Sequence, residues 1–213
     1  GALRTLSAMV RALDGRVRED TQAFLREHDP HVGRGFPLLS GMWGIAPGTV
    51  ASSRWSRATL PPFLDRLPDS LRAIAEDAAV GVKVKPGDLL VREGGPPDGV
   101  FILVGGRVQV LATVAPEVSI HLAELGPDSV VGSTLAILGA PHSASCMAIE
   151  PVTAVRLDPA VWMGLLSVEA VEASALRVAL LQSMSAWIPP IRDRVACSKR
   201  CLHGVIRAQL LTP

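Results

Sequence analysis

The chain has 213 residues, of which 48% are hydrophobic and 19% charged, and its 21 basic and 20 acidic side chains give a formal net charge of +1. This composition predicts a folded chain with a core, and the balanced charge gives no general case for binding nucleic acid or an anionic membrane. No apolar run reaches the roughly 18–20 residues of a membrane span, because the best candidate, residues 35–50, is broken by glycines and prolines. No direct membrane span is therefore expected.

The cysteine content favours a reducing compartment. Cys146, Cys197 and Cys201 form an odd and sparse set, which does not fit a disulfide framework. Cys197 and Cys201 lack a second ligand pair for zinc, so no metal site is predicted. No secretory signal is visible, and we expect a cytoplasmic location, which includes the cytosolic face of a membrane protein. The chain does not begin with methionine, so we expect it to be part of a longer or processed protein.

The N-terminal part predicts one amphipathic helix followed by irregular structure. Apolar residues recur at spacings of three and four from Leu3 to Val17, and Phe24 continues the stripe. This pattern predicts a helix over residues 2–28 that packs on a partner surface. Glycine, proline and serine punctuate residues 41–56, which we interpret as a linker or irregular wrap.

Two short helices are predicted before a β-rich region. Thr59 followed by Leu-Pro-Pro is a typical helix start, and an apolar face continues to about Ala79 with a break at Pro68. From Val80 to Leu157, short β-rich runs alternate with turn signals, which predicts a barrel or jelly roll. The expected strands are residues 81–84, 89–91, 99–104, 107–112, 118–122, 146–148 and 153–157, with one inserted short helix over residues 133–138.

The helical pattern returns after the β-rich region. Apolar spacing predicts two segments between Val161 and Met184 and a last helix from Ile191 to Leu210. The predicted fold class is therefore α+β: a β-barrel of the jelly-roll kind with one inserted short helix, flanked by N- and C-terminal helices. We divide the chain into an N-terminal helix and linker, a central domain and a C-terminal helical extension, which are residues 1–56, 57–166 and 167–213.

Residues 85–110 resemble the first half of a cyclic nucleotide-binding domain. They read KPGDLLVREGGPPDGVFILVGGRVQV. The family pattern is a Pro-Gly-Asp turn, an Arg-Glu-Gly turn, an aspartate, an aromatic-aliphatic strand and a glycine before the next strand. Every element is present in order and at matching spacing, and the resemblance covers roughly residues 60–165.

The turn glycines of this stretch carry structural expectations. Gly87 and Gly94 are expected to take positive φ at tight turns. Gly105 and Gly106 are expected to close a two-residue hairpin between the strands on either side. Residues 100–104 alternate in a way that predicts a strand covered on both faces.

The resemblance places a ligand-binding cassette in the second half of the domain. The family cassette reads Phe-Gly-Glu, a short helix, then Pro-Arg-Ala-Ala. It implies helix N–H groups that face a cyclic phosphate, a glutamate that binds the ribose 2′-hydroxyl and an arginine that neutralises the phosphate. Residues 130–145, VVGSTLAILGAPHSAS, keep the glycine, the helix and the proline, but carry Ser133 for the glutamate and His142 for the arginine.

These departures predict weak or lost cyclic-nucleotide binding. Losing both polar anchors lowers affinity by about two to four decades. Polar neighbours can recover part of the loss, and His142 can serve when protonated, which makes its contribution pH-dependent. Cyclic AMP and cyclic GMP are the candidate ligands, and no other cofactor is predicted. The candidate ligand-binding residues are Gly132, Ser133, Thr134, His142 and Ser143.

These patterns together predict a non-enzymatic regulatory or sensory domain in the cytosolic part of a larger protein. No nucleophile–base constellation is present, so no catalytic residue is predicted. The Gly-Ser-Thr-Leu start of the cassette is similar to divergent domains in the cytoplasmic tails of plant-type salt-tolerance Na⁺/H⁺ exchangers, which implies an exchanger or channel as the regulated part.

Two other readings compete with this one. The first is a ligand-free structural or interaction module that contacts other domains or chains of a larger assembly through its outer helices. The second is a transcription regulator, which needs a helix-turn-helix after the barrel. The tail from Cys197 has neither the length nor the second periodic helix for that motif, so nucleic acid is not an expected partner.

Overall fold

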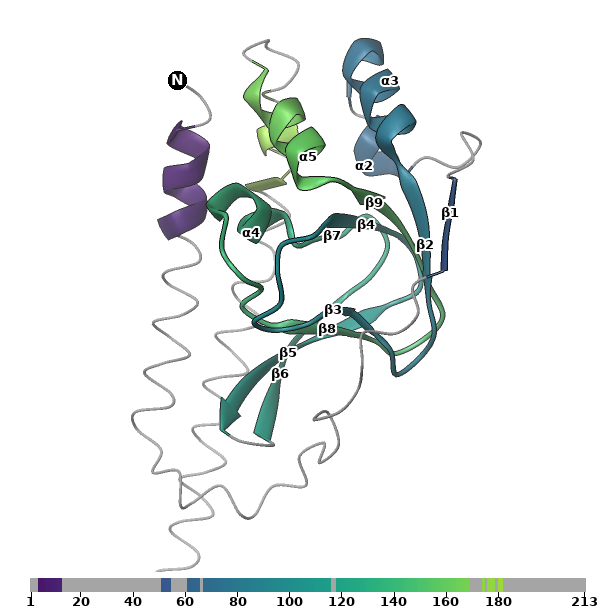
Figure 1. Ribbon diagram of the computed structural model, residues 1–213, viewed down its shortest axis with the longest axis vertical. Coiled ribbons are helices and arrows are strands. Elements are labelled where there is room, and N and C mark those ends of the chain that lie inside the picture. The colour runs from purple at the N-terminus through teal and green to yellow at the C-terminus, as the bar shows by residue number, and fades with distance from the viewer. Residues whose placement is uncertain are drawn as a thin grey trace, which may run out of the picture.

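The computed structural model describes residues 4–12, 51–54, 61–65, 67–115, 118–168, 174, 176–178 and 180–181. The strands in this part of the chain form two antiparallel sheets, with helices on the outer side of one of them (Figure 1). The first sheet has the order β1-β2-β9-β4-β7 and the second β3-β8-β5-β6. The strands are β1 Ala51–Arg54, β2 Val80–Val84, β3 Leu89–Val91, β4 Val100–Gly105, β5 Val108–Ala115, β6 Val118–Leu125, β7 Val130–Val131, β8 Ser145–Ala148 and β9 Val152–Leu157. The helices are α2 Pro62–Asp65, α3 Asp69–Ala78, α4 Ser133–Leu138 and α5 Pro159–Ser167, and residues 4–12 are also helical.

Strand β4 of the first sheet is covered on both faces, as the alternation in residues 100–104 predicted. Val100 and Ile102 of β4 face the helices, whereas Phe101 and Leu103 face the second sheet. Figure 1 shows α3, α4 and α5 on one side of β4 and β9, and the second sheet on the other. We call the two resulting clusters the helix-side core, which includes Val100, Ile102, Val155, Leu157, Trp162 and Leu165, and the inter-sheet core, which includes Val82, Phe101, Leu103, Val110 and Ala154.

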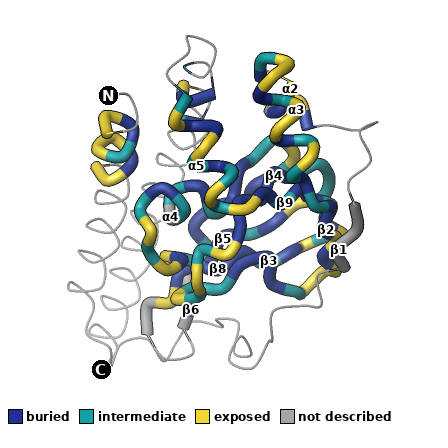
Figure 2. The backbone as a smooth tube through the Cα atoms, turned by 45° about the horizontal axis from the view of Figure 1, so that its top comes forward, coloured by how far each residue is buried: buried dark blue, intermediate teal, exposed yellow. Residues whose placement is uncertain are grey.

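The helices reach the helix-side core through one face each. Figure 2 shows β3, β4 and β8 as mostly buried, whereas the helices alternate between buried and exposed residues. α5 begins with a conventional cap: the Asp158 carboxylate accepts a hydrogen bond from the Ala160 amide at 2.8 Å, and Pro159 occupies the first turn. Leu6 and Val10, one turn apart in the helix of residues 4–12, are buried in the same core.

Most of the predicted elements are present. The inserted helix is α4, with the expected bounds, and α2 and α3 lie on either side of the break at Pro68. Gly87 and Gly94 have φ values of 86° and 75°, as their turns required. The expected jelly-roll-like α+β fold is confirmed, although the described strands form two open sheets and not one closed barrel.

The predicted hairpin at Gly105 and Gly106 is wrong. β4 pairs with β9 and β7 in the first sheet, whereas β5 pairs with β6 and β8 in the second. The turn therefore carries the chain from one sheet to the other. Gly106 has a φ of 81°, and a Cβ atom there would collide with the Pro151 carbonyl oxygen. The close approach of these two segments of the backbone therefore requires a glycine.

Two further strands were not predicted. β1 lies inside residues 41–56, which we interpreted as irregular, and it pairs with β2 in the register Ala51 to Lys83. β7 has two residues and pairs with β4. β1 is too polar and β7 too short for a periodic signal in the sequence. Each forms because it pairs with a neighbouring strand. The predicted helical residues 13–28 and 191–210 lie outside the described residues.

Candidate functional site

The cassette, residues 130–145, joins the first sheet to the second. It begins with β7, which pairs Val131 with Phe101 of β4, and it ends in β8. Between them α4 contacts both α5 and β4, and Ile137 is buried in the helix-side core. The cassette is therefore positioned by both sheets and by α5.

Replacement of Gly132 by any other residue would destabilise the cassette. Its φ is +83°, and a Cβ atom there would stand 2.7 Å from the carbonyl oxygen of Gly99. The Gly132 carbonyl accepts a hydrogen bond of 3.1 Å from the Ala136 amide, which closes the first turn of α4. The same Cβ position lies 3.4 Å from Cε1 of His142, so the imidazole lies directly beside this backbone.

The main chain of His142 is clamped to the Arg-Glu-Gly turn. The His142 amide donates to the Gly95 carbonyl at 2.9 Å, and the Gly94 amide donates to the His142 carbonyl at 2.7 Å. Next to this contact, the Glu93 amide donates a hydrogen bond to Ser145 Oγ at 2.9 Å. The glycine turn of residues 93–95, which is distant in sequence, thereby fixes the main chain of His142.

The His142 side chain is buried and incompletely paired. It is 5% exposed, and its Nε2 atom has no hydrogen-bond partner among the described residues. Burial lowers the pKa of His142, and the charge of Asp98 and a hydrogen bond with the Pro96 carbonyl oppose that shift. The ring is therefore held neutral over more of the pH range than an exposed histidine.

The other predicted site residues differ in exposure. Ser133 is 1% exposed at the start of α4, Thr134 is half-buried and Ser143 is exposed. The structure brings Gly132 and His142 into contact, with Ser133 next to Gly132 in the chain. Because α4 has six residues, its peptide dipoles add over less than two turns, and we assign no anion site to its N-terminus alone.

Sequence reasoning missed the residues that hold the loop against His142. Asp98 and Pro96 act on the imidazole, and Gly99 packs on Gly132. Arg156 of β9 donates to the Asp98 carbonyl and so ties this loop to the first sheet. The family pattern marks Asp98 as part of a turn, but no local signal indicates that the turn meets a histidine 44 positions later.

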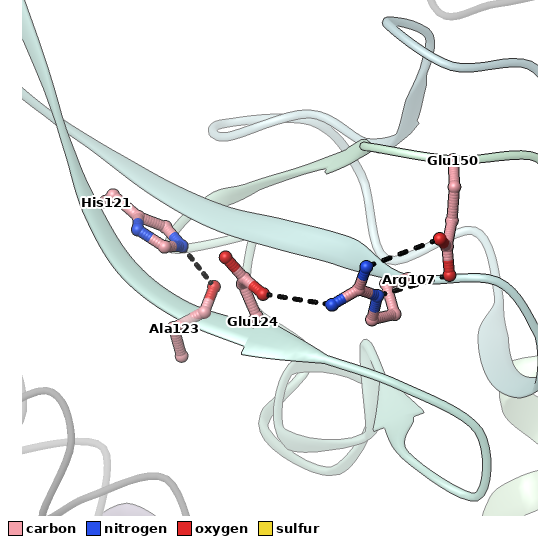
Figure 3. A network of polar contacts seen from close by, with 5 residues as sticks. All are labelled: Arg107, His121, Ala123, Glu124 and Glu150. Carbon is pink, nitrogen blue, oxygen red and sulfur yellow. Dashed lines mark hydrogen bonds and ion pairs between the residues drawn. The ribbon is translucent and has the colours of Figure 1, made fainter.

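A second polar network lies away from the cassette (Figure 3). The Arg107 guanidinium donates to both Glu150 carboxylate oxygens, at 3.2 and 3.5 Å, and lies 3.8 Å from the Glu124 carboxylate. The hydrogen bond to Glu150 is the main cause of a raised pKa for Arg107. In β6, His121 Nε2 and the Ala123 carbonyl are 3.0 Å apart. The charged groups satisfy one another in solvent, so this network joins strand ends and is not a candidate site.

Other kinds of functional site would need clustered metal ligands, a long apolar helix or a reactive thiol. The described residues contain no group of three histidine, cysteine, aspartate or glutamate residues that could hold a metal ion. None of their helices combines the length and the apolarity that a bilayer crossing requires. Cys146 is buried in the inter-sheet core, where desolvation raises the pKa of its thiol to about 12, so it is an inert core residue.

Comparison with known proteins agrees with the fold. The family model of the cyclic nucleotide-binding domain matches residues 81–169. A crystal structure of a cyclic nucleotide-binding domain from Methylobacillus flagellatus superposes with a TM-score of 0.56 at 20% identity, covering 66% of this chain and 82% of that one. A mutant cAMP-binding acyltransferase from Mycobacterium smegmatis has a TM-score of 0.43 at 27% identity and covers 47% of this chain and 31% of its own.

A curated relative is an enzyme. The acetyltransferase Pat of Mycolicibacterium smegmatis is 30% identical over 138 residues, which are 65% of this chain and 40% of the relative. The chain thus spans less than half the length of that protein. The expectation of a non-enzymatic protein is contradicted by this finding. It rested on the absence of a catalytic constellation, and a regulatory domain lacks one even when it belongs to an enzyme.

The same comparisons give no support to the resemblance to exchanger tails. That resemblance rested on four residues at the start of the cassette, which is too short a stretch to separate branches of one fold family. The turn pattern of residues 85–110, the two-sheet architecture and the family match agree with one another. Residues 81–169 therefore match the cyclic nucleotide-binding domain family in both sequence and fold.

Proposed function

We propose that this domain is a cytoplasmic regulatory module that binds a cyclic nucleotide weakly and controls an enzymatic part of a larger protein. The kinship with an acetyltransferase supports an acyl-transfer enzyme as the regulated part. The sparse cysteines, of which Cys146 is a free buried thiol, support the location.

The observation that carries the proposal is the main-chain geometry of the cassette and of the turn that holds His142. Gly132 keeps positive φ against the Gly99 carbonyl, and His142 is clamped between Gly94 and Gly95. This geometry presents the side chain at the position of the family arginine to a site bordered by Gly132. We assign ligand contacts to Gly132, Ser133, Thr134, His142 and Ser143.

The weakness of binding follows from two side chains. Ser133 cannot reach as far as the glutamate that it replaces, and His142 is a neutral imidazole where the family has a fixed cation. A charge-assisted hydrogen bond contributes about 1.5–3 kcal/mol, so the loss of two leaves micromolar to millimolar affinity for a site that would otherwise bind tightly.

A ligand-free interaction module is the second candidate. The near-complete burial of Ser133 and His142 favours it, because these side chains fill the cassette themselves. In that case the outer helices would dock other domains or chains of the assembly, and the cassette would serve only to join the two sheets.

Isothermal titration calorimetry with cyclic AMP and cyclic GMP separates the candidates. We expect weak saturable binding to the wild type and at least tenfold tighter binding to the double variant Ser133→Glu/His142→Arg. A matched control, Ser70→Glu/Ala73→Arg, places the same side chains on exposed positions of α3 and should not change the affinity. If the double variant folds and binds neither nucleotide, the regulatory ligand site does not exist and the second candidate stands.

A further inference from the structure

We infer that anion binding at the cassette is coupled to a proton: a phosphodiester ligand binds together with one proton that His142 takes up. The inference rests on the proposed function and deepens it, since it specifies which protonation state of the site accepts the ligand. It follows from the placement of one imidazole between Gly132 and the loop of residues 94–99.

The main chain of His142 is held in place, and its imidazole is buried with one nitrogen that has no hydrogen-bond partner among the described residues. Hydrogen bonds to Gly94 and Gly95 hold its backbone, and Cε1 lies against Gly132 at the cassette. Nε2 has no partner among the described residues, although the side chain is only 5% exposed. An unpaired buried polar atom is unfavourable by about 1–3 kcal/mol, and a ligand that pairs with it recovers this free energy.

The protonation state decides which ligands can pair with Nε2. We assign the hydrogen bond with the Pro96 carbonyl to Nδ1, because Nε2 is the unpaired nitrogen. In the neutral ring Nδ1 then carries the proton, and Nε2 presents a lone pair that repels an anion. In the imidazolium, Nδ1 keeps its bond to Pro96 while Nε2–H becomes a charge-assisted donor to a phosphate oxygen.

The groups around the ring determine the direction of the coupling. Asp98, from the loop after β3, is the acidic group whose charge acts on His142, and it favours the cation. Arg156 of β9 is the basic residue that contacts this loop, and its guanidinium donates a hydrogen bond to the Asp98 carbonyl. The cassette side contributes Gly132, Ser133 and Thr134, which carry no charge. Desolvation dominates and keeps the ring neutral until a bound anion offsets it.

The ligand class follows from this arrangement. One cationic donor beside a glycine backbone fits a singly charged phosphodiester better than a phosphate monoester, whose second charge would lack a partner in the described site. A cyclic nucleotide has such a phosphodiester. It stays ionised across the titration range of histidine, so a pH-dependent affinity would come from the protein.

The experiment measures cyclic AMP affinity by calorimetry between about pH 5.5 and 8 for wild type, His142→Arg and His142→Gln. In the wild type the liganded state binds more protons than the free state. Affinity should therefore fall by up to about tenfold per pH unit above the free pKa. Titrations in buffers of different ionisation enthalpy should report uptake of one proton. His142→Arg should bind more tightly with no pH dependence, and His142→Gln should bind more weakly with none.

The outcomes separate the inference from the proposed function. Wild-type binding that does not vary with pH would overturn the proton coupling and leave the ligand site in place. Binding by His142→Arg with a wild type that is silent at every pH would also overturn it, because His142 would then not act as a donor. Silence of all three folded proteins and of Ser133→Glu/His142→Arg would overturn both. Circular dichroism of each variant confirms that it is folded.

Discussion

At the residue scale, the cassette depends on a contact between Gly132 and its neighbours that tolerates no side chain. Gly132 combines positive φ with a carbonyl oxygen 2.7 Å from the position of a Cβ atom. Gly139, at the other end of α4, also has positive φ, but nothing lies within 4 Å of its Cβ position. An alanine at position 139 would therefore meet backbone strain alone, whereas an alanine at position 132 would meet both strain and steric overlap.

We expect Gly132→Ala to destabilise the protein by clearly more than Gly139→Ala. Positive φ alone is unfavourable for alanine by about 1–2 kcal/mol, and Gly132→Ala adds a clash with the Gly99 backbone. Urea unfolding of both variants measures the difference. Equal losses would mean that the loop bearing Gly99 moves away freely and that the cassette is not held rigidly.

His142 makes stability depend on pH. Because its pKa is lower in the folded than in the unfolded state, the unfolded state binds more protons as the pH falls below about 6.5, and the folded state loses stability. We expect wild type to lose up to about 1.4 kcal/mol per pH unit more than His142→Gln in that window. Chemical unfolding from pH 8 downward tests this. Parallel curves for the two proteins would contradict it, since the other histidines are common to both.

At the element scale, the end of α5 is capped by a residue of the following segment. Arg177 is 9% exposed, and its guanidinium donates to the Leu166 and Val168 carbonyls at 3.0 and 2.8 Å and to Ser174 Oγ at 3.0 Å. Leu166 is in the last turn of α5 and Val168 is its C-cap, where carbonyl oxygens lack intrahelical partners. Arg177 and Ser174 are thus fastened to the end of α5, the helix that α4 of the cassette contacts.

We expect Arg177→Ala to lower the free energy of unfolding by about 2–3 kcal/mol, because it removes the donor to the buried Leu166 carbonyl and to the half-buried Val168 carbonyl. Arg177→Lys should rescue part of the loss, since an ammonium cannot reproduce the planar fork. Arg107→Ala is the control: it removes an arginine whose ion pairs are exposed, and it should have a smaller effect. Similar losses for Arg177→Ala and Arg107→Ala in urea unfolding would show that the cap is unimportant.

At the scale of the whole molecule, the first sheet lies between two cores. The inter-sheet core joins the two sheets, and the helix-side core collects α3, α4, α5, residues 176 and 180, and the helix of residues 4–12. Segments from both ends of the described chain therefore meet on the face of the sheet that also carries α4.

We expect Leu6→Ala to destabilise the whole domain by about 2–4 kcal/mol, because Leu6 is 2% exposed in the helix-side core. Met9 is in the same helix but 48% exposed, so Met9→Ala should change stability by less than about 0.5 kcal/mol. Thermal unfolding followed by the fluorescence of the tryptophans measures both. A silent Leu6→Ala would mean that the N-terminal helix contributes nothing to this core.

Much of the fold was predictable from local pattern. Alternation in residues 100–104, the break at Pro68 and the bounds of α4 were all confirmed, because periodicity and turn residues act over a few positions. The hairpin at Gly105 and Gly106 was wrong, since a glycine pair permits a tight turn but does not decide which strands pair. For the site, the sequence identified Gly132 as a match to the family pattern and His142 as a departure from it. It could not predict that Asp98 and Pro96 border the imidazole.

The sequence by itself determined the turn pattern that resembles the family, and it placed Ser133 and His142 where that resemblance expects two charged anchors, because residue identity and spacing define both. Only the tertiary structure decided that His142 is buried beside Gly132 with an unpaired Nε2 and a lowered pKa. That environment is created by a turn much earlier in the chain, through the hydrogen bonds of Gly94 and Gly95 with His142. Desolvation depends on everything packed around a group, so no local pattern contains it.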